Sequence, residues 1–423
     1  MNKSIKSSDE TLFHITPSGM PVRYIKRKGM KTFYFYVLVN YGSQELEYID
    51  SKENRHHKIT PGTAHFLEHK IFESKDKSTF ETFSRQSASV NAYTGFSSTV
   101  YYFYCTSQIK ENIGLMMRLI TDTYINNETV EKEKGIITQE IKMYYDNPGW
   151  RTFNNFLNSL YKKNTVKYDV AGSIKDVESI TPEELLRVYG DFYTSDNMTV
   201  FALGDMDEKQ LFTAMDEAPA AGRGKELRRI YPDEDRTVGR AFFTESMSIG
   251  ERLFAMGFKE VPFGGENDGM KKELIYKIIM DSVIGPVSRL YDELYEKALI
   301  DASFGYGLSS GLNFTYSLAS GSSREPEGVR DAFFKEIDTL KSKGMEKKQF
   351  DSIKRMLLGE SIRLSDNDES FIKTIISLYN KKQDWFAMPE VLETISLEEA
   401  NRTLENVMKE DSFSLAVTVP LKQ

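Results

Sequence analysis

The organisation of the chain is decided by residues 180–204, ITPEELLRVYGDFYTSDNMTVFALG. This stretch aligns without gaps on residues 395–419, ISLEEANRTLENVMKEDSFSLAVTV, so the two copies are separated by about half of the 423-residue chain. The second residue of each copy carries a hydroxyl, Thr181 or Ser396, and a glutamate follows three positions later, the pattern of a helix capping box. A repeat this long indicates two domains of similar fold, because a solenoid would repeat about every 20–50 residues.

The remainder of each half mixes strands with helices. Strands are predicted in residues 32–45, TFYFYVLVNYGSQE, and 252–265, RLFAMGFKEVPFGG, and helices in residues 271–285 and 328–344. The class predicted is therefore α+β, with two homologous domains that each pack helices on a mostly antiparallel sheet.

The domain boundaries follow from one stretch of unusual composition. Residues 217–236, EAPAAGRGKELRRIYPDEDR, are rich in charge, alanine, glycine and proline and have no apolar period. We expect an N-terminal domain at 1–216, this linker at 217–236, and a C-terminal domain at 237–423.

The charge balance argues against nucleic acid or an anionic membrane as a partner. The chain has 63 acidic and 55 basic side chains, a net charge of −8. No stretch approaches the roughly 18 consecutive apolar residues that span a bilayer, and the N-terminus has no apolar segment typical of a secretion signal. The single cysteine, Cys105, lies in an aromatic run and is interpreted as a buried strand residue. We therefore expect a cytoplasmic protein.

Residues 65–69, HFLEH, have the spacing of a metal site with its own base. His65 and His69 lie one helical turn apart, so both imidazoles can reach one zinc ion, and Glu68 lies to one side, where it can act as a general base on a metal-bound water. Thr60 and Pro61 predict the start of this helix, as cap and first residue. The order H-x-x-E-H reverses the commoner H-E-x-x-H motif. On five residues alone, an ordinary helix with two surface or core histidines stays an alternative.

A third protein ligand is available in residues 129–148, TVEKEKGIITQEIKMYYDNP, which are predicted to be helical. Glu133 and Glu140 are seven residues apart, so both face the same way. One carboxylate could complete the zinc site while the other hydrogen-bonds a ligand histidine and fixes its orientation. A solvated face of glutamate and lysine pairs is the alternative interpretation.

Together these features resemble the pitrilysin/insulinase family of zinc peptidases, M16, over nearly the whole chain and in its two-domain processing-peptidase form. The resemblance implies that His65, His69 and Glu140 bind Zn²⁺, that Glu68 is the catalytic base, and that Glu133 supports a ligand histidine. It also gives SVNAYTG, residues 89–95, the role of an edge strand to which an extended peptide adds as a further strand.

In the family, this edge strand lies beside the zinc site. Asn91, Ala92 and Tyr93 would therefore line the substrate site. Pairing through the main chain would allow peptides of varied sequence to bind.

The chain departs from the family pattern at one point. Active members usually carry an arginine and, seven residues later, a tyrosine that contact substrate, but the aligned positions here are Tyr295 and Ala302. A phenol cannot replace a guanidinium in binding a carbonyl or oxyanion. Arg289 and Tyr306 are weak substitutes.

We therefore expect a heterodimer in which a paralogous M16-like subunit supplies the missing pair and the two chains enclose a chamber. The predicted function is that of the catalytic subunit of a zinc-dependent endopeptidase that processes peptides or unfolded segments. The alternatives are a scaffold without catalysis and a subunit that binds peptides without cutting them.

Overall fold

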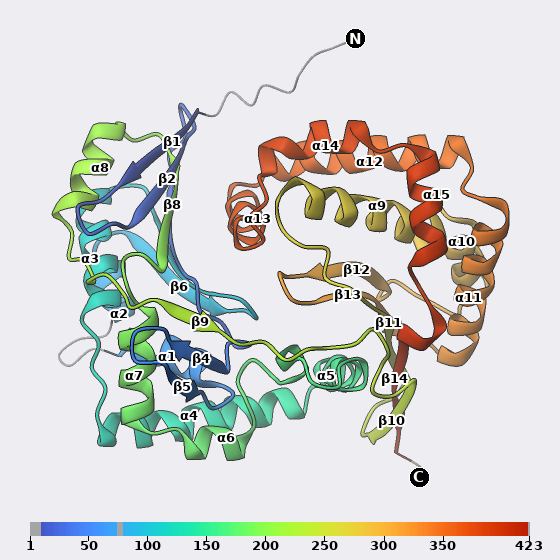
Figure 1. The fold of residues 1–423 in the computed structure, drawn as a ribbon, viewed down its shortest axis with the longest axis horizontal. Coiled ribbons are helices and arrows are strands. Elements are labelled where there is room, and N and C mark those ends of the chain that lie inside the picture. The colour runs from blue at the N-terminus through green and yellow to red at the C-terminus, as the bar shows by residue number, and fades with distance from the viewer. Residues whose placement is uncertain (1–9, 74–78, 422–423) are drawn as a thin grey trace. The chain divides into compact units, whose positions relative to one another are not determined.

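The computed structural model describes residues 10–73 and 79–421, which form two compact units (Figure 1). The first unit comprises Met1–Ile141 and Asp169–Tyr231, and the second comprises Lys142–Tyr168 and Pro232–Gln423. This differs from a simple division at the 217–236 linker, because residues 142–168 belong to the second unit. The reason is the packing of helix α5, which buries apolar side chains against the sheet of that unit. α5 spans Pro148–Leu160, and its buried apolar residues are Phe156, Leu157 and Leu160.

The first unit is built on a six-stranded sheet. Its order is β1 (Glu10–Ile15), β2 (Pro21–Lys26), β8 (Met198–Gly204), β3 (Phe33–Val39), β7 (Thr99–Cys105) and β6 (Ala88–Thr94). β2 and β8 are parallel, and every other neighbouring pair is antiparallel. The predicted strand in residues 32–45 is therefore confirmed as a central strand, and β6 lies at an edge of the sheet. Cys105, at the end of β7, is buried as expected.

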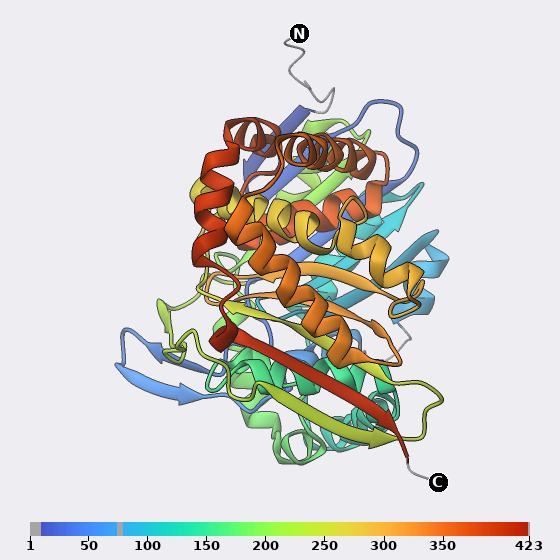
Figure 2. The same ribbon diagram turned by 90° about the vertical axis from the view of Figure 1, so that its right-hand side faces the viewer.

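The helices of this unit are α1 (Thr63–Phe72), α2 (Thr79–Arg85), α3 (Ile109–Thr121), α4 (Asn127–Tyr145), α6 (Ile174–Ser179), α7 (Pro182–Phe192) and α8 (Glu208–Glu217). Of these, α1, α2 and α3 contact strands β6 and β7 on one face of the sheet. Phe72 of α1 and Phe83 of α2 pack on the rings of Tyr101 and Phe103 in β7, which identifies the covered face. A small sheet of β5 (Arg55–Lys58), β4 (Glu47–Asp50) and β9 (Leu227–Arg229) completes the unit, and Figure 2 shows its hairpin in blue.

The second unit repeats this plan. Its five-stranded sheet has the order β10 (Phe242–Met247), β14 (Phe413–Pro420), β11 (Leu253–Glu260), β13 (Thr315–Ser322) and β12 (Gly305–Ser310). β10 and β14 are parallel and the other pairs are antiparallel, as at the corresponding place in the first sheet. The longer helices are α9 (Glu266–Ile284), α11 (Pro326–Lys343), α12 (Lys347–Ser365) and α13 (Asp368–Asn380). Shorter ones are α10 (Arg289–Glu296), α14 (Met388–Thr394) and α15 (Leu397–Asn406).

The internal repeat of the sequence corresponds to matching elements. α7 and β8 in the first unit match α15 and β14 in the second, in the same order and in the alignment that the sequence indicates. The hydroxyls of Thr181 and Ser396 accept hydrogen bonds from the amides of Glu184 and Glu399, as a helix cap requires. The Glu399 carboxylate pairs with Lys271 on α9, 2.8 Å away, so the second half of the predicted capping box serves tertiary packing.

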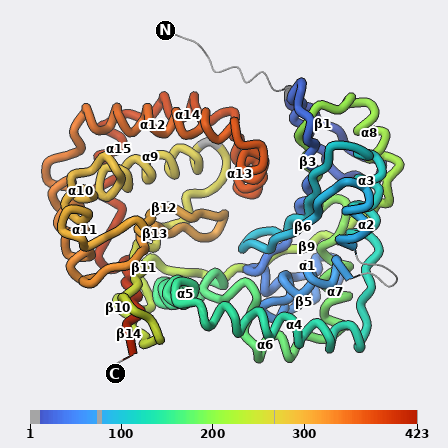
Figure 3. The backbone as a smooth tube through the Cα atoms, turned by 180° about the vertical axis from the view of Figure 1, so that it is seen from behind, coloured from blue at the N-terminus to red at the C-terminus, as the bar shows by residue number. Residues whose placement is uncertain are grey.

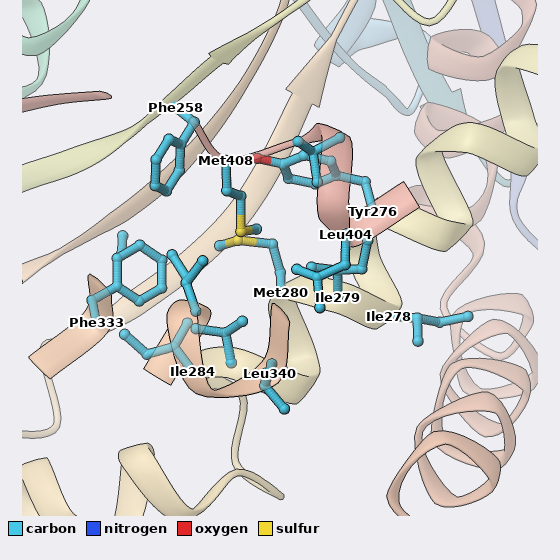
Figure 4. Close-up of a cluster of buried hydrophobic side chains, with 14 of the residues drawn as sticks. Phe258, Tyr276, Ile278, Ile279, Met280, Ile284, Phe333, Leu340, Leu404 and Met408 are labelled. Carbon is cyan, nitrogen blue, oxygen red and sulfur yellow. The ribbon is translucent and has the colours of Figure 1, made fainter. Parts of the chain in front are cut away.

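The core of the second unit surrounds α9, whose helix is apolar on several sides. Figure 4 shows its side chains with residues from the sheet and from α11 and α15. The labelled residues are Phe258, Tyr276, Ile278, Ile279, Met280, Ile284, Phe333, Leu340, Leu404 and Met408. All of them are buried, so α9 is a central helix with layers of structure around it.

Candidate metal centre

The helix that carries the HFLEH motif begins later than the sequence predicts. α1 starts at Thr63, and its N-cap residue is Gly62, with φ of 90°. Thr60 was expected to cap the helix, but its amide and hydroxyl both donate to the carboxylate of Glu184, at 2.7 and 3.0 Å. Pro61 therefore lies in the turn before the helix. The prediction was wrong because Glu184, far away in the sequence, engages Thr60.

The turn before α1 is held by a close approach of two backbone segments. A Cβ atom on Gly62 would lie 2.4 Å from the carbonyl oxygen of Ala171, and one on Gly172 would lie 2.6 Å from the carbonyl oxygen of Pro61. Both glycines have positive φ, 90° and 73°. Glycine at both positions therefore permits the backbone at residues 171–172 to pack directly against the turn at residues 61–62, where α1 begins.

His65, His69 and Glu140 come together as the motif predicts. Oε2 of Glu140, on α4, lies 3.8 Å from Nε2 of His65 and 3.4 Å from Nε2 of His69. The possible ligand atoms of the three residues all lie within 4.8 Å of one another. Figure 3 shows α1 and α4 side by side. The i, i+4 spacing places both imidazoles on one face of α1, and α4 brings the carboxylate to the same point.

The donor set suits a catalytic zinc ion. Ligand atoms at 2.0–2.2 Å from a tetrahedral ion are separated from each other by about 3.4 Å, close to the two distances at Glu140. Two imidazoles and one carboxylate leave the fourth position open for water or substrate. His65, His69 and Glu140 are each partly buried, with 12%, 24% and 22% of the side chain exposed, so the site can be reached from solvent. The residues present therefore fit Zn²⁺.

Glu133 is hydrogen-bonded to one of the two histidines. Its Oε1 lies 2.9 Å from Nδ1 of His69, on the side of the ring opposite Nε2. Glu133 is 8% exposed and lies two turns before Glu140 on α4. One helix thus presents a carboxylate to each nitrogen of the same imidazole, which directs Nε2 of His69 toward Glu140.

The pKa values of the two histidines are shifted in opposite directions. Burial lowers the pKa of His65 to about 4, so this imidazole is neutral at pH 7. Burial acts on His69 in the same direction, but its hydrogen bonds with Glu133 and Glu140 outweigh burial and raise the pKa of His69 to about 9. Burial also raises the pKa of Glu68, while a hydrogen bond from Thr94 acts in the opposite direction.

Glu68 lies in the same site and contacts the edge strand. Thr94, the last residue of β6, donates from its hydroxyl to Oε2 of Glu68 at 2.5 Å. Thr94 also lies 3.5 Å from the hydroxyl of Thr99 in β7. Thr94 closes the NAYT segment, and it is not among the site residues that the sequence predicts. Its position in the strand register is the signal that could have identified it.

The register of β6 shows which backbone groups face the edge of the sheet. The amide of Gly95 donates to the carbonyl of Ser98, so these two residues form a hydrogen-bonded pair. Pairs alternate along an antiparallel ladder, and the N–H and C=O of Ala92 and Thr94 therefore point away from β7, to the free edge. The Ala92 amide is engaged locally by the Asn91 side-chain oxygen, at 2.8 Å.

The three expected substrate-contacting residues do not share one face. Ala92 pairs with Tyr101 and points to the face that α1 covers. Asn91 and Tyr93 alternate with it and point to the other face, where the Tyr93 ring lies edge-on to Tyr102. The structure therefore brings the side chain of one of the three, Ala92, to the face that carries the histidines.

Arg289 and Tyr306, the weak substitutes for the arginine and tyrosine of the family pattern, both have partners within the second unit. Arg289 projects into solvent, with 85% of its side chain exposed, and pairs with Glu293 on its own helix. Tyr306 donates its hydroxyl to Asp281 at 2.6 Å. Tyr295, at the aligned arginine position, is a solvent-exposed phenol.

The other three histidines have partners outside the metal site. His14 lies 2.7 Å from Asp216, His56 lies 3.0 Å from Glu47, and the ring of His57 stacks on Tyr48. None of the three belongs to the cluster of His65, His69 and Glu140 among the described residues.

No helix within residues 10–73 and 79–421 has the length and apolar character needed to cross a membrane.

Two family models match the chain. Residues 51–173 match "Insulinase (Peptidase family M16)", and residues 179–357 match "Peptidase M16 inactive domain". The uncharacterized zinc protease YmfH of Bacillus subtilis is 29% identical, and the alignment covers 97% of each chain. The mitochondrial-processing peptidase subunit beta of Caenorhabditis elegans is 26% identical over 47% of this chain and 42% of its own length.

Solved structures share the whole fold. The crystal structure of an M16-like peptidase from Alicyclobacillus acidocaldarius has a TM-score of 0.95 and 26% identity, and covers 99% of this chain and 100% of its own. A protease from Helicobacter pylori has a TM-score of 0.84 at 15% identity, covers 97% of this chain and 100% of its own, and supports the fold alone. With two M16 models matched in succession and full-length relatives in sequence and structure, the chain belongs to peptidase family M16, the insulinase family.

Proposed function

We propose that this chain is the catalytic subunit of a zinc-dependent endopeptidase that cleaves extended peptides or unfolded segments. The observation that carries the proposal is the convergence of His65, His69 and Glu140, from two helices far apart in sequence, with Glu68 beside them. A helix that carried two histidines by chance would have no reason to meet a third ligand and a carboxylate base.

Each residue has a chemical role in this proposal. His65, His69 and Glu140 would hold a zinc ion, and the chemistry that such an ion would supply is a bound water with a pKa near about 7 and polarisation of the scissile carbonyl. Glu68 accepts the proton of the attacking water and passes it to the nitrogen of the leaving amine. Glu133 keeps Nε2 of His69 directed at the site. No covalent bond to the protein is needed.

The substrate would bind as a strand on β6. The N–H and C=O groups of Ala92 and Thr94 that face the edge of the sheet can pair with the main chain of a peptide, which does not depend on its sequence. The Asn91 side chain now engages the Ala92 amide and would have to yield to the peptide. Extended or unfolded segments are therefore the substrate class, since a folded protein has few unpaired strands to offer.

A partner subunit is part of the proposal. Arg289 and Tyr306 are engaged with Glu293 and Asp281, which favours a second, related chain as the source of the missing arginine and tyrosine. The isolated chain would then be weakly active or inactive. Its partner and its location in the cytoplasm stay predictions.

The proposal is tested with purified wild type and Glu68→Gln, each loaded with zinc. We expect one zinc per chain in both, chelator-sensitive cleavage of an unfolded protein by the wild type together with its partner, and a fall of about 10²–10⁴ in the variant. Glu131→Gln, an exposed residue on α4, is the matched control. Zinc binding without any product, with every related chain tested, would support the scaffold or peptide-binding alternative.

A further inference from the structure

The contact between Thr94 and Glu68 joins the substrate strand to the catalytic base. Thr94 ends β6, and its hydroxyl donates to Oε2 of Glu68. Its own N–H and C=O point to the free edge of the same strand. One residue therefore meets the base with its side chain and the proposed substrate with its main chain.

The direction of this hydrogen bond is fixed by its neighbours. Thr99 is fully buried and donates its hydroxyl hydrogen to the carbonyl of Tyr41, at 3.0 Å. Its single hydrogen is thereby committed, and it can meet Thr94, 3.5 Å away, as an acceptor only. The hydrogen of Thr94 is directed at Glu68, because an ionised carboxylate offers acceptors alone.

We propose that Thr94 is a positioning residue for Glu68, an inference that rests on the proposed function. Its hydroxyl holds Oε2 in place and so presents the other oxygen, Oε1, to the proton of the attacking water. The proton moves from that water to Oε1 as the oxygen attacks the carbonyl carbon. It then moves from Oε1 to the amine nitrogen as the carbon–nitrogen bond breaks.

The arrangement also links substrate register to the base. A peptide that pairs with the edge groups of Ala92 and Thr94 fixes the backbone of the residue that holds Glu68. Strand addition would therefore reduce the motion of the base at the moment when the scissile bond is placed. A peptide bound out of register would not gain this effect.

The test compares Thr94→Val, which keeps the shape of the side chain without the hydroxyl, with Thr94→Ser, which keeps the hydroxyl. We expect kcat to fall about 10–100-fold in Thr94→Val with KM changed less than about threefold, the scale seen when a residue that orients a catalytic group is lost. Thr94→Ser should stay within a few fold of wild type. Thr339→Val, where the hydroxyl donates to the Lys335 carbonyl within α11, is the matched control.

A crystal structure of Thr94→Val supplies a measurement that needs no turnover. We expect the Glu68 carboxylate to leave its wild-type position and occupy other rotamers, with zinc content unchanged. Unchanged kcat in Thr94→Val, equal losses in Thr94→Val and Thr94→Ser, or a Glu68 side chain that does not move would each overturn the inference. If the wild type binds zinc and cuts nothing, the proposed function fails, and the position of Glu68 in this crystal structure still decides the role of Thr94.

Discussion

The two nitrogens of the His69 ring face two carboxylates of one helix. Nδ1 lies 2.9 Å from Oε1 of Glu133, and Nε2 lies 3.4 Å from Oε2 of Glu140. The seven-residue spacing on α4 therefore orients the imidazole from behind while it presents a third ligand in front. This relationship determines how the site responds to mutation and to pH.

Removing the carboxylate behind His69 should weaken metal binding. We expect Glu133→Ala to lower zinc affinity about 10–100-fold, because the ring loses the contact that fixes its tautomer and direction. Glu133→Gln keeps an acceptor and should lose less. Competition against a chelator of known affinity measures both, with Glu131→Gln as control. Equal affinity in all four proteins would contradict the role given to Glu133.

Zinc affinity should rise with pH between 7 and 9. The pKa of His69 is about 9 without metal, so at pH 7 the ring carries a proton that zinc must displace, whereas His65, with a pKa of about 4, is already neutral. The expected slope from His69 is about tenfold per pH unit below 9. Calorimetry in buffers of different ionisation enthalpy counts the protons released. In Glu133→Ala the pKa of His69 should be lower and fewer protons should be released at pH 7; an unchanged count would contradict this origin.

Gly62→Ala should destabilise the first unit. The substitution places a methyl group against the Ala171 carbonyl and requires a left-handed backbone, which alone costs about 1–2 kcal/mol. We expect a total loss above about 2 kcal/mol and a lower Tm. Gly135→Ala is the matched control, because Gly135 lies inside α4 with open space around it, and alanine there should stabilise by about 0.5–1 kcal/mol. A Gly62→Ala protein as stable as wild type would show that the two backbone segments can separate freely.

Asp281→Asn should stabilise the second unit at neutral pH. Burial raises the pKa of Asp281 to about 6, although Tyr306 donates to one of its oxygens. The folded state therefore favours the neutral form of Asp281. The stabilisation that results, measured as free energy of unfolding, is fully present below about pH 4 and is lost as the pH rises through 6. The loss is about 1–3 kcal/mol by pH 7. Thermal unfolding at pH 4.5 and 7.5 should show a gain for the variant at the higher pH alone, and Asp331→Asn on the surface should show none.

The parts of the fold that depend on residues close together in the sequence could be predicted from the sequence alone. The helix that carries Glu140, the strand at residues 33–39 and the matched helix–strand pairs all follow from apolar periodicity and from the internal repeat. The start of α1 could not be predicted in this way, because Glu184 engages Thr60 from a distant part of the chain. In sequence, α5 (Pro148–Leu160) is an ordinary amphipathic helix, and only its packing against β11 and β14 assigns it to the second unit.

The same distinction between local and long-range information applies to the candidate site. Spacing predicted that His65, Glu68 and His69 share one region of a helix and that Glu133 and Glu140 share one face of another, because helical geometry fixes the face on which each residue lies. The alternation of side chains along β6 and the bond from Thr94 to Glu68 depend on strand register, which needs the partner strand to be known.

The contact of Gly62 with Ala171 and of Gly172 with Pro61 has a consequence for judging related chains. These glycines are required by the course of the backbone, whether or not any bond is ever cut nearby. A related chain that had lost catalysis and kept only a structural role would still need both glycines. It would not need the two histidines. The presence of both glycines in a related chain therefore indicates that the backbone fold is kept. Whether that chain is an active enzyme depends on other positions.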